Sequence, residues 1–264
     1  MAKKQFKAES KRLLDLMINS IYTNKEIFLR EIISNASDAI DKLCYLSLTD
    51  DKVGLDRGDY KIDIIVDKDA RTITVRDNGI GMTAEEAESN LGVIAKSGSY
   101  KFKDEMDSGK ADDISIIGQF GVGFYSAFMV ADEVTVITRK YGESEGAKWV
   151  SKGADGYTVT PCEKDTVGTD VIMHIKPDSD EEIYGTFLET WKLKALVKKY
   201  SDYVRWPIKM DIQHPERYET GEKTDEGLPK YEYKMVTENE TVNSMVPIWQ
   251  RSKSEVTDDD CIAW

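Results

Sequence analysis

Apolar residues recur at helical spacing in the first part of the chain. Residues 9–22 place leucine, methionine and isoleucine three to four positions apart, which predicts an amphipathic helix. Thr23-Asn24 breaks this pattern, and a second helix is predicted from about Lys25 to Leu46. Two further helices are predicted from residue pairs typical of capping boxes: 83–91, with Thr83 and Glu86, and 179–200, with Ser179 and Glu182.

Elsewhere the pattern alternates with a period of two, which is typical of strands. Residues 60–66 and 71–77 are predicted to form a strand pair. Residues 118–130 are predicted to be a glycine loop that runs into a helix. Strand-like segments then follow one another: DEVTVITRK (132–140), AKWVSKG (147–153), YTVTPCEK (157–164), GTDVIMHIK (168–176) and, last, RWPIKMDIQ (205–213).

The order of these elements predicts the fold class. Helices at the front and a run of strands behind them favour α+β layering over alternating βαβ units. Residues 97–119 are polar and poorly periodic, and a segment of this length inside a domain is more often functional than idle. Three regions are predicted: a domain over 1–213, a charged linker over 214–243 with a possible strand at 230–236, and a further unit that begins at 244–264 and is not completed.

Composition narrows the function classes. The 264 residues include 40% hydrophobic and 32% charged residues, which is typical of a globular domain, and the net charge of −13 argues against binding a nucleic-acid backbone. No apolar run approaches the length that spans a bilayer, and the lysine-rich N-terminus lacks the apolar region of a signal peptide. Three scattered cysteines and two histidines favour a reducing cytoplasm and give little support to a disulfide framework, a zinc site or a Ser-His-Asp triad.

One stripe of the second predicted helix carries chemistry-bearing side chains. At about 100° per residue, Glu31, Asn35, Asp38 and Lys42 fall within roughly 60° of one another, beside the apolar face. Carboxylates at the edge of a core are costly unless an ionic or hydrogen-bonding partner meets them. The opposite face, with Arg30, Ser34, Ser37 and Asp41, is predicted to face solvent. An ordinary polar edge with a Glu31–Asn35 contact and an Asp38–Lys42 ion pair fits the same spacing.

Two glycine-rich segments are further candidates. In DNGIGM (77–82), Asp77 ends a strand, and a carboxylate on a wall of small residues can accept a hydrogen bond from an exocyclic amine. A plain Asn-Gly turn explains the same residues. In GQFGVGF (118–124), backbone N–H groups that open a helix could hold phosphates. Neither a Rossmann unit nor a Walker loop fits that segment, because strands follow it and no GK[ST] is present.

Together these segments resemble the heat shock protein 90 chaperone family in its bacterial HtpG-like form. The resemblance rests on YTNKEIFLREIISNASDA (22–39), DNGIGM, NLGVIAKSGS (90–99), GQFGVGFYSAF (118–128) and GTDV (168–171), in that order. It covers about residues 5–213, and PIWQRS (247–252) resembles the start of a middle domain. It implies a two-layer α/β sandwich of the histidine-kinase, topoisomerase and chaperone ATPase type, with a mixed, mostly antiparallel sheet and helices on one face.

The resemblance also implies roles for individual residues. Glu31 would activate water, Asn35 would coordinate magnesium, and Asp77 would accept a hydrogen bond from the adenine amino group of ATP or ADP, with Thr169 supporting the adenine end. Asp38 and Lys42 would lie on the rim, and residues 92–123 would form a mobile lid. The remaining pocket and phosphate-facing residues would be Gly81, Met82, Asn90, Leu91, Lys96, Gly121, Val122, Gly123 and Phe124.

The implied function is nucleotide-driven remodelling of client proteins by a cytoplasmic chaperone that hydrolyses ATP. The family's middle domain, with an arginine for the terminal phosphate, and its dimerising C-terminal domain have no counterpart in this chain. We therefore expect this chain to be a monomer that hydrolyses ATP slowly, and the full-length protein to be a homodimer. Neither a nucleic acid nor a membrane is expected as a partner. A sensor kinase and a binding module without catalysis are the rival interpretations.

Overall fold

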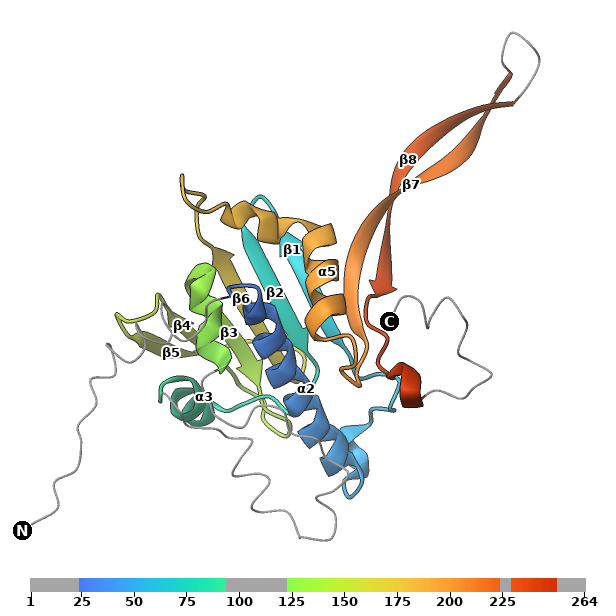
Figure 1. Ribbon diagram of the computed structural model, residues 1–264. Coiled ribbons are helices and arrows are strands. Elements are labelled where there is room, and N and C mark those ends of the chain that lie inside the picture. The colour runs from blue at the N-terminus through green and yellow to red at the C-terminus, as the bar shows by residue number, and fades with distance from the viewer. Residues whose placement is uncertain (1–23, 94–122, 224–228, 251–264) are drawn as a thin grey trace, which may run out of the picture.

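The computed structural model describes residues 24–93, 123–223 and 229–250 (Figure 1). The helix predicted over 9–22 and the polar segment 97–119 lie outside these residues. None of the helices in the described part of the chain is both long and apolar enough to cross a bilayer.

One mixed sheet forms the frame of the molecule. Its eight strands lie in the order β5-β4-β3-β6-β2-β1-β7-β8, and every neighbouring pair is antiparallel except β1 with β7. The strands are β1 Ile62–Asp67, β2 Thr72–Asp77, β3 Ala131–Arg139, β4 Gly146–Ser151, β5 Tyr157–Cys162, β6 Gly168–Ile175, β7 Ile208–Lys223 and β8 Pro229–Thr241. The mostly antiparallel sheet predicted from the sequence is confirmed.

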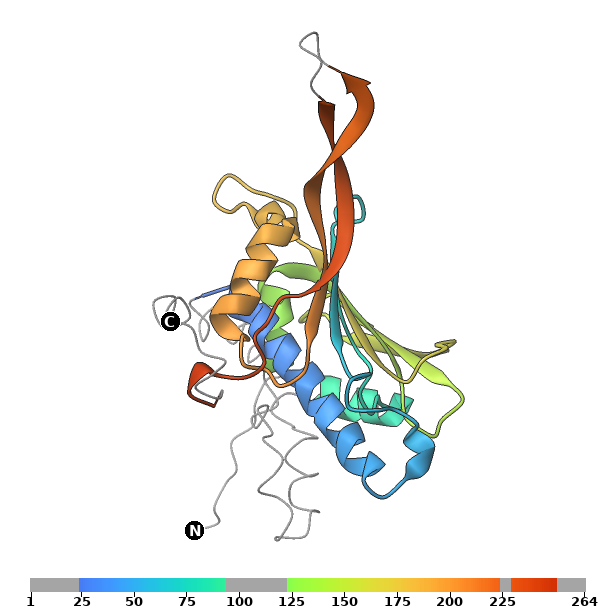
Figure 2. The ribbon, with the colours of Figure 1, turned by 90° about the vertical axis from the view of Figure 1, so that its right-hand side faces the viewer.

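Helices cover one face of this sheet, so the molecule has the two layers that were predicted. The helices are α2 Ile27–Ser47, α3 Ala84–Leu91 and α5 Thr190–Tyr200, with 3-10 turns η2 Asp51–Val53, η4 Gly123–Met129, η5 Tyr184–Leu188 and η6 Ile248–Gln250. Figure 2 shows α2 and α5 on the same side of the strands. The core lies between the layers, where Ile32 and Ile40 of α2 and Ile73 of β2 are all fully buried.

The face of α2 that was predicted to be solvent-exposed is mostly buried. Ser34, Ser37 and Asp41 are buried, and only Arg30 of this set is partly exposed. The reason is tertiary: α5 packs beside α2, and the indole N–H of Trp206 donates to Asp41 Oδ1 at 3.1 Å. Burial raises the pKa of Asp41, while the positive charge of Arg205 and the Trp206 hydrogen bond oppose the shift.

The charged segment that was predicted as a linker from residue 214 is a strand instead. β7 continues to Lys223 and pairs with β8, and together they project from the sheet as a long hairpin (Figure 1). The strand suspected at 230–236 is confirmed within β8. A two-stranded ribbon beyond the sheet exposes both faces to water, so charged residues such as Lys234 and Glu216, paired at 3.0 Å, fit it. The division into domains itself stays a prediction.

Two helix predictions also change at their boundaries. Ser179 and Glu182 do bond to each other, the Glu182 N–H donating to Ser179 Oγ at 3.1 Å, but no helix starts there. The chain forms the short turn η5 first, and α5 begins only at Thr190. The helix predicted after the glycine loop is the 3-10 turn η4. The capping box of Thr83 and Glu86 is confirmed at the start of α3.

Candidate functional site

The polar stripe of α2 lies where the helix faces β2 and η4. Asp38 is buried, Lys42 is half-buried and Asn35 is exposed. Burial lowers the pKa of Lys42, and the negative charges of Asp38, Glu86 and Asp77 oppose that shift. The charge of Lys42 therefore interacts with Glu86 in the capping box of α3 and with Asp77 at the end of β2.

Glu31 lies against the first residue of the glycine-rich turn. The guanidinium of Arg30 donates from Nε to Glu31 Oε1 at 2.9 Å and also from Nη2. A Cβ on Gly123 would lie only 2.4 Å from Glu31 Oε2, so the chain passes this carboxylate because residue 123 has no side chain. The Glu31–Asn35 contact expected of an ordinary helix edge is replaced by the Arg30 pair.

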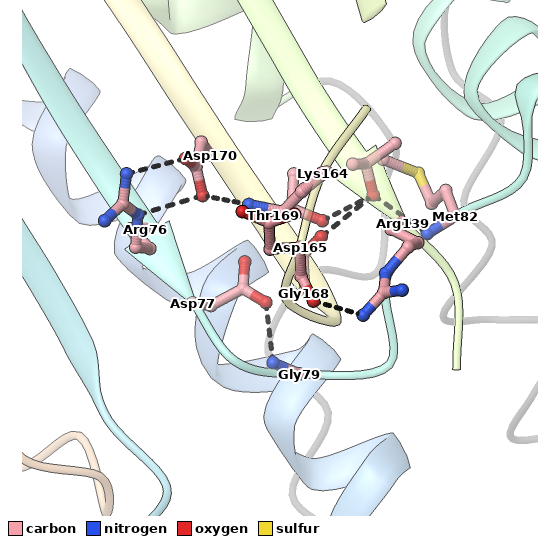
Figure 3. Close-up of polar contacts among 11 residues, drawn as sticks. Arg76, Asp77, Gly79, Met82, Arg139, Lys164, Asp165, Gly168, Thr169 and Asp170 are labelled. Atoms are coloured by element: carbon pink, nitrogen blue, oxygen red, sulfur yellow. Dashed lines mark hydrogen bonds and ion pairs between the residues drawn. The ribbon is translucent and has the colours of Figure 1, made fainter. Parts of the chain in front are cut away.

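Asp77 ends β2 and faces the helix layer. Only 5% of the residue is exposed, and its Oδ1 accepts a hydrogen bond from the Gly79 N–H at 2.9 Å (Figure 3). Burial raises the pKa of Asp77 to about 7, the Asp170 charge adds to the shift, and the Gly79 bond opposes it. The described residues provide this carboxyl with backbone donors only, so it retains lone pairs for a further donor.

The turn after Asp77 fits closely against α2. A Cβ on Gly79 would lie 2.4 Å from the carbonyl carbon of Ala39 and 2.6 Å from the Ile40 nitrogen. The next residue, Ile80, donates its N–H to the Ala39 oxygen at 3.0 Å. Helix and turn are thus docked through backbone atoms. This fixes Asp77 relative to the stripe of α2.

Strands β3 and β6 supply the wall beside Asp77. In the sheet register Thr169 lies opposite both Asp77 and Thr138. The Thr138 and Thr169 hydroxyls are 2.9 Å apart, and Thr138 Oγ1 accepts the Met82 N–H at 2.9 Å. Figure 3 shows Asp77, Thr169 and Met82 on neighbouring segments. The sequence interpretation overlooked Thr138, although the period-two burial of β3 puts it on the inner face with Val136.

The remaining predicted residues border the same region. Asn90 Nδ2 lies 3.9 Å from the Met82 sulfur, and the Leu91 carbonyl accepts the Tyr125 hydroxyl at 2.9 Å. Phe124 is buried and meets the Trp149 ring edge-on at 5.4 Å. Gly81 lies against the backbone of Arg139. The predicted residues Lys96, Gly121 and Val122 lie outside the described residues.

These residues suit a nucleotide and its metal ion. A buried acceptor at Asp77 fits a base that offers an amino group, and the exposed Asn35 amide offers the hard oxygen ligand that magnesium prefers. Glu31, one helical turn before Asn35, adds a carboxylate on the same stripe. The arrangement can hold a base at one end and direct a carboxylate toward phosphates at the other.

Comparison with known proteins identifies relatives of this chain. The chain is 60% identical over 260 residues to Chaperone protein HtpG of Bacillus subtilis (strain 168), 57% to that of Clostridium botulinum and 55% to that of Clostridium perfringens (strain ATCC 13124 / Type A). Each match covers 98% of this chain and 40% of the relative, so the chain spans about two fifths of their length.

A family model described as histidine kinase-, DNA gyrase B-, and HSP90-like ATPase matches residues 22–157. This match contains α2, the turn after Asp77 and the glycine-rich segment, and it covers more than half of the chain. The chain therefore belongs to the histidine kinase-, DNA gyrase B- and HSP90-like ATPase family.

Proposed function

We propose that this chain is the ATP-binding and ATP-hydrolysing part of an HtpG-type chaperone. The observation that carries the proposal is Asp77, a buried carboxyl at a turn docked on α2, which receives backbone donors only from the part of the chain that the structure describes. Its free lone pairs suit the adenine amino group, and its burial makes an unpaired state unfavourable. The 60% identity to a chaperone HtpG supports the same assignment.

In this proposal the residues of α2 serve the phosphate end. Glu31 would accept a proton from the attacking water, and Asn35 would offer an oxygen ligand to magnesium. Magnesium supplies charge neutralisation at the phosphates when it is bound. Arg30 binds one oxygen of the Glu31 carboxylate, Oε1, which leaves the other oxygen, Oε2, to accept the proton. Gly123, the first residue of η4, lies against Oε2, so the start of η4 borders the same phosphate end.

The remaining assignments concern the full-length protein, because this chain spans about two fifths of the length of its HtpG relatives. Client proteins as partners, a homodimer through segments beyond this chain, and a location in the cytoplasm follow from the resemblance to the HtpG relatives. Closure of residues 92–123 over the nucleotide belongs to the same proposal.

The test of the proposal is the variant Asp77→Asn. It replaces an acceptor oxygen with an amide donor, so we expect ADP affinity to fall by at least about tenfold while the circular dichroism spectrum is unchanged. Titration calorimetry measures the affinity. Asp63→Asn is the matched control, because Asp63 is an aspartate of β1 that pairs with Lys61 at 2.8 Å and alternates with the buried residues Ile62 and Ile64, so it points to the other face of the sheet. Unchanged ADP affinity in Asp77→Asn contradicts the assignment.

A further inference from the structure

Lys176 is a half-buried lysine directly after β6, a strand that lies between β3 and β2 inside the sheet. Its ammonium group donates to two backbone carbonyls at the end of η4, that of Phe128 at 2.8 Å and that of Met129 at 3.3 Å. Its backbone N–H donates to the Val130 carbonyl at 2.9 Å. One residue at the end of β6 therefore binds three successive carbonyls where η4 ends.

The chemistry of a lysine suits this place. The last carbonyls of a helical segment lack partners within it and carry the negative end of its dipole, whereas an ammonium group offers three donors and a positive charge. Burial lowers the pKa of Lys176, and the nearby charge of Lys25 adds to this shift. The charges of Glu182 and Asp132 oppose it. Because a buried ammonium is costly unless it is paired, the carbonyl contacts are what stabilise it under η4.

The other end of η4 borders the proposed phosphate end of the site. A Cβ on its first residue, Gly123, would lie 2.4 Å from Glu31 Oε2. The Ser126 hydroxyl donates to the Gly123 carbonyl at 2.6 Å, which links this first residue to the rest of the short segment. Figure 1 shows η4, in green, beside α2. A displacement of η4 would therefore change the surroundings of the Glu31 carboxylate.

We propose that Lys176 is a positioning residue for ATP hydrolysis, which fixes η4 on the end of β6 so that Gly123 keeps its place against Glu31. This inference rests on the proposed function, because Lys176 acts through the proposed base and not through contact with the nucleotide. A displacement of about 1 Å at a catalytic group can lower a rate by roughly 10²-fold.

The base end of the site should not depend on Lys176. Asp77 pairs in register with Thr169, near the start of β6, whereas Lys176 follows the end of that strand. Seven residues separate Thr169 from Lys176 in sequence, which corresponds to roughly 23 Å at about 3.3 Å per residue. Changes at sites this far apart usually act independently. Loss of the Lys176 contacts should thus affect turnover and spare base binding.

The test measures turnover and base binding separately in the 264-residue chain. Lys176→Met removes the ammonium group, and we expect ATP turnover at saturation to fall by at least about tenfold. Adenosine affinity, measured by calorimetry, should change by less than about twofold. Lys176→Arg keeps the charge and the donors, so it should recover most of the turnover. If Lys176→Met does not fold, as judged by circular dichroism, Lys176→Gln removes the charge and keeps a polar side chain, with the same expected direction.

Two controls accompany these variants. Lys68→Met removes a lysine that pairs with Glu189 at 2.8 Å, and it should change neither quantity. Glu31→Ala gives the background rate of the preparation. Unchanged turnover in folded Lys176→Met overturns the inference. An equal loss of turnover and adenosine affinity, which indicates a general loss of structure, overturns it as well, and so does the absence of any recovery in Lys176→Arg.

Failure of the proposed function gives a different result. If the unaltered chain does not bind adenosine, or turns over ATP no faster than Glu31→Ala, the proposed function fails and this inference fails with it. If the unaltered chain binds adenosine and hydrolyses ATP, and Lys176→Met does both equally well, only the role of Lys176 is overturned.

Discussion

At Glu31 a single carboxylate combines a structural contact with the proposed chemistry. It pairs with Arg30 and lies against Gly123, while the proposed base pocket at Asp77 is built from other segments. We therefore expect Glu31→Ala to keep ATP affinity within a few-fold and to lower turnover by roughly 10²–10⁴-fold. Phosphate release and calorimetry measure the two quantities. Glu133→Ala, which removes a glutamate of β3 paired with Lys152 at 3.6 Å, should change neither.

A parallel loss of ATP affinity and turnover in Glu31→Ala would identify Glu31 as a binding or structural residue instead. Because the basal rate is expected to be low, the rate must also be measured with an inactive preparation that reports contaminating ATPases. Asp77→Asn provides that preparation at ATP concentrations well below its weakened affinity for nucleotide.

The raised pKa of Asp77 predicts a pH dependence of base binding. Its folded pKa of about 7 lies above the usual aspartate value, so the unliganded protein takes up a proton as the pH falls through 7. The ionised carboxylate is the better acceptor for an amino group, so binding should release this proton. Adenosine, which has no phosphate to titrate, should bind about fivefold more weakly at pH 6 than at pH 7.

The same shift has a sign for stability. Ionised Asp77 is disfavoured by burial, so its contribution to stability is greatest below the unfolded pKa and is lost as the pH rises through about 7.

The predicted pH dependence of binding is tested separately. Calorimetry in buffers with different ionisation enthalpies reports proton release on adenosine binding. An affinity that is constant between pH 6 and pH 8, without proton release, contradicts the prediction.

The sequence predicts a candidate site residue when neighbouring residues alone indicate its position. It does not when the position depends on contacts between distant segments. Glu31 and Asp77 were found because helical spacing and a strand end are visible in a short window. Thr138 and the Arg30–Glu31 pair were not, because a threonine is common in a strand such as β3 and side-chain rotamers leave no sequence signal. Only the pairing of β3 with β6 and the path of the chain after β2 show that Thr138 meets Thr169 and Met82.

At the scale of elements, the docking of the turn on α2 is the most constrained contact. Gly79→Ala would place a Cβ against backbone atoms of Ala39 and Ile40, which cannot move as a side-chain tip can. We expect a loss of about 1–3 kcal/mol in the free energy of unfolding, with weakened ADP binding. Urea unfolding measures the stability. Gly58→Ala is the matched control, since a Cβ there meets nothing within 4 Å. Equal stability of the two variants would contradict the docking argument.

Helices and strands could be predicted from the sequence where one face is buried and the other is exposed. The prediction failed where both faces are exposed, or where burial depends on a segment distant in the sequence. Period-two alternation helped to locate β1, β2, β3, β4 and β6, because these strands have buried residues on their inner face. The far half of the β7–β8 hairpin has two exposed faces, so its charges resemble those of a linker. The outer side of α2 is polar in sequence, and its burial becomes visible only once α5 and Trp206 lie against it.

For the whole molecule, the candidate site lies where the two layers meet. The helix layer carries the candidate residues Glu31 and Asn35, and the sheet carries Asp77, Thr138 and Thr169. The match to the family model ends at residue 157, before β6, so it does not include Thr169, which the sheet register puts opposite Asp77. In the proposed site the base of the nucleotide lies against the sheet and its phosphates lie against α2. A nucleotide bound in this way contacts both layers, which suits a domain that transmits the change from ATP to ADP to other segments of the protein.

The largest-scale prediction concerns those other segments. The chain covers 40% of the length of its HtpG relatives, and the resemblance implies that an arginine for the terminal phosphate lies in the remainder. In other phosphoryl-transfer systems a supplied arginine accelerates the reaction by about 10³–10⁵-fold. We therefore expect the 264-residue chain to bind ATP and ADP and to hydrolyse ATP much more slowly than the same chain continued with the C-terminal segments of the Bacillus subtilis relative.

Phosphate release at equal nucleotide saturation measures both rates, and Glu31→Ala in the extended chain is the control for contaminating activity. Equal rates would mean that residues 1–264 are catalytically self-sufficient and that the missing arginine does not limit turnover.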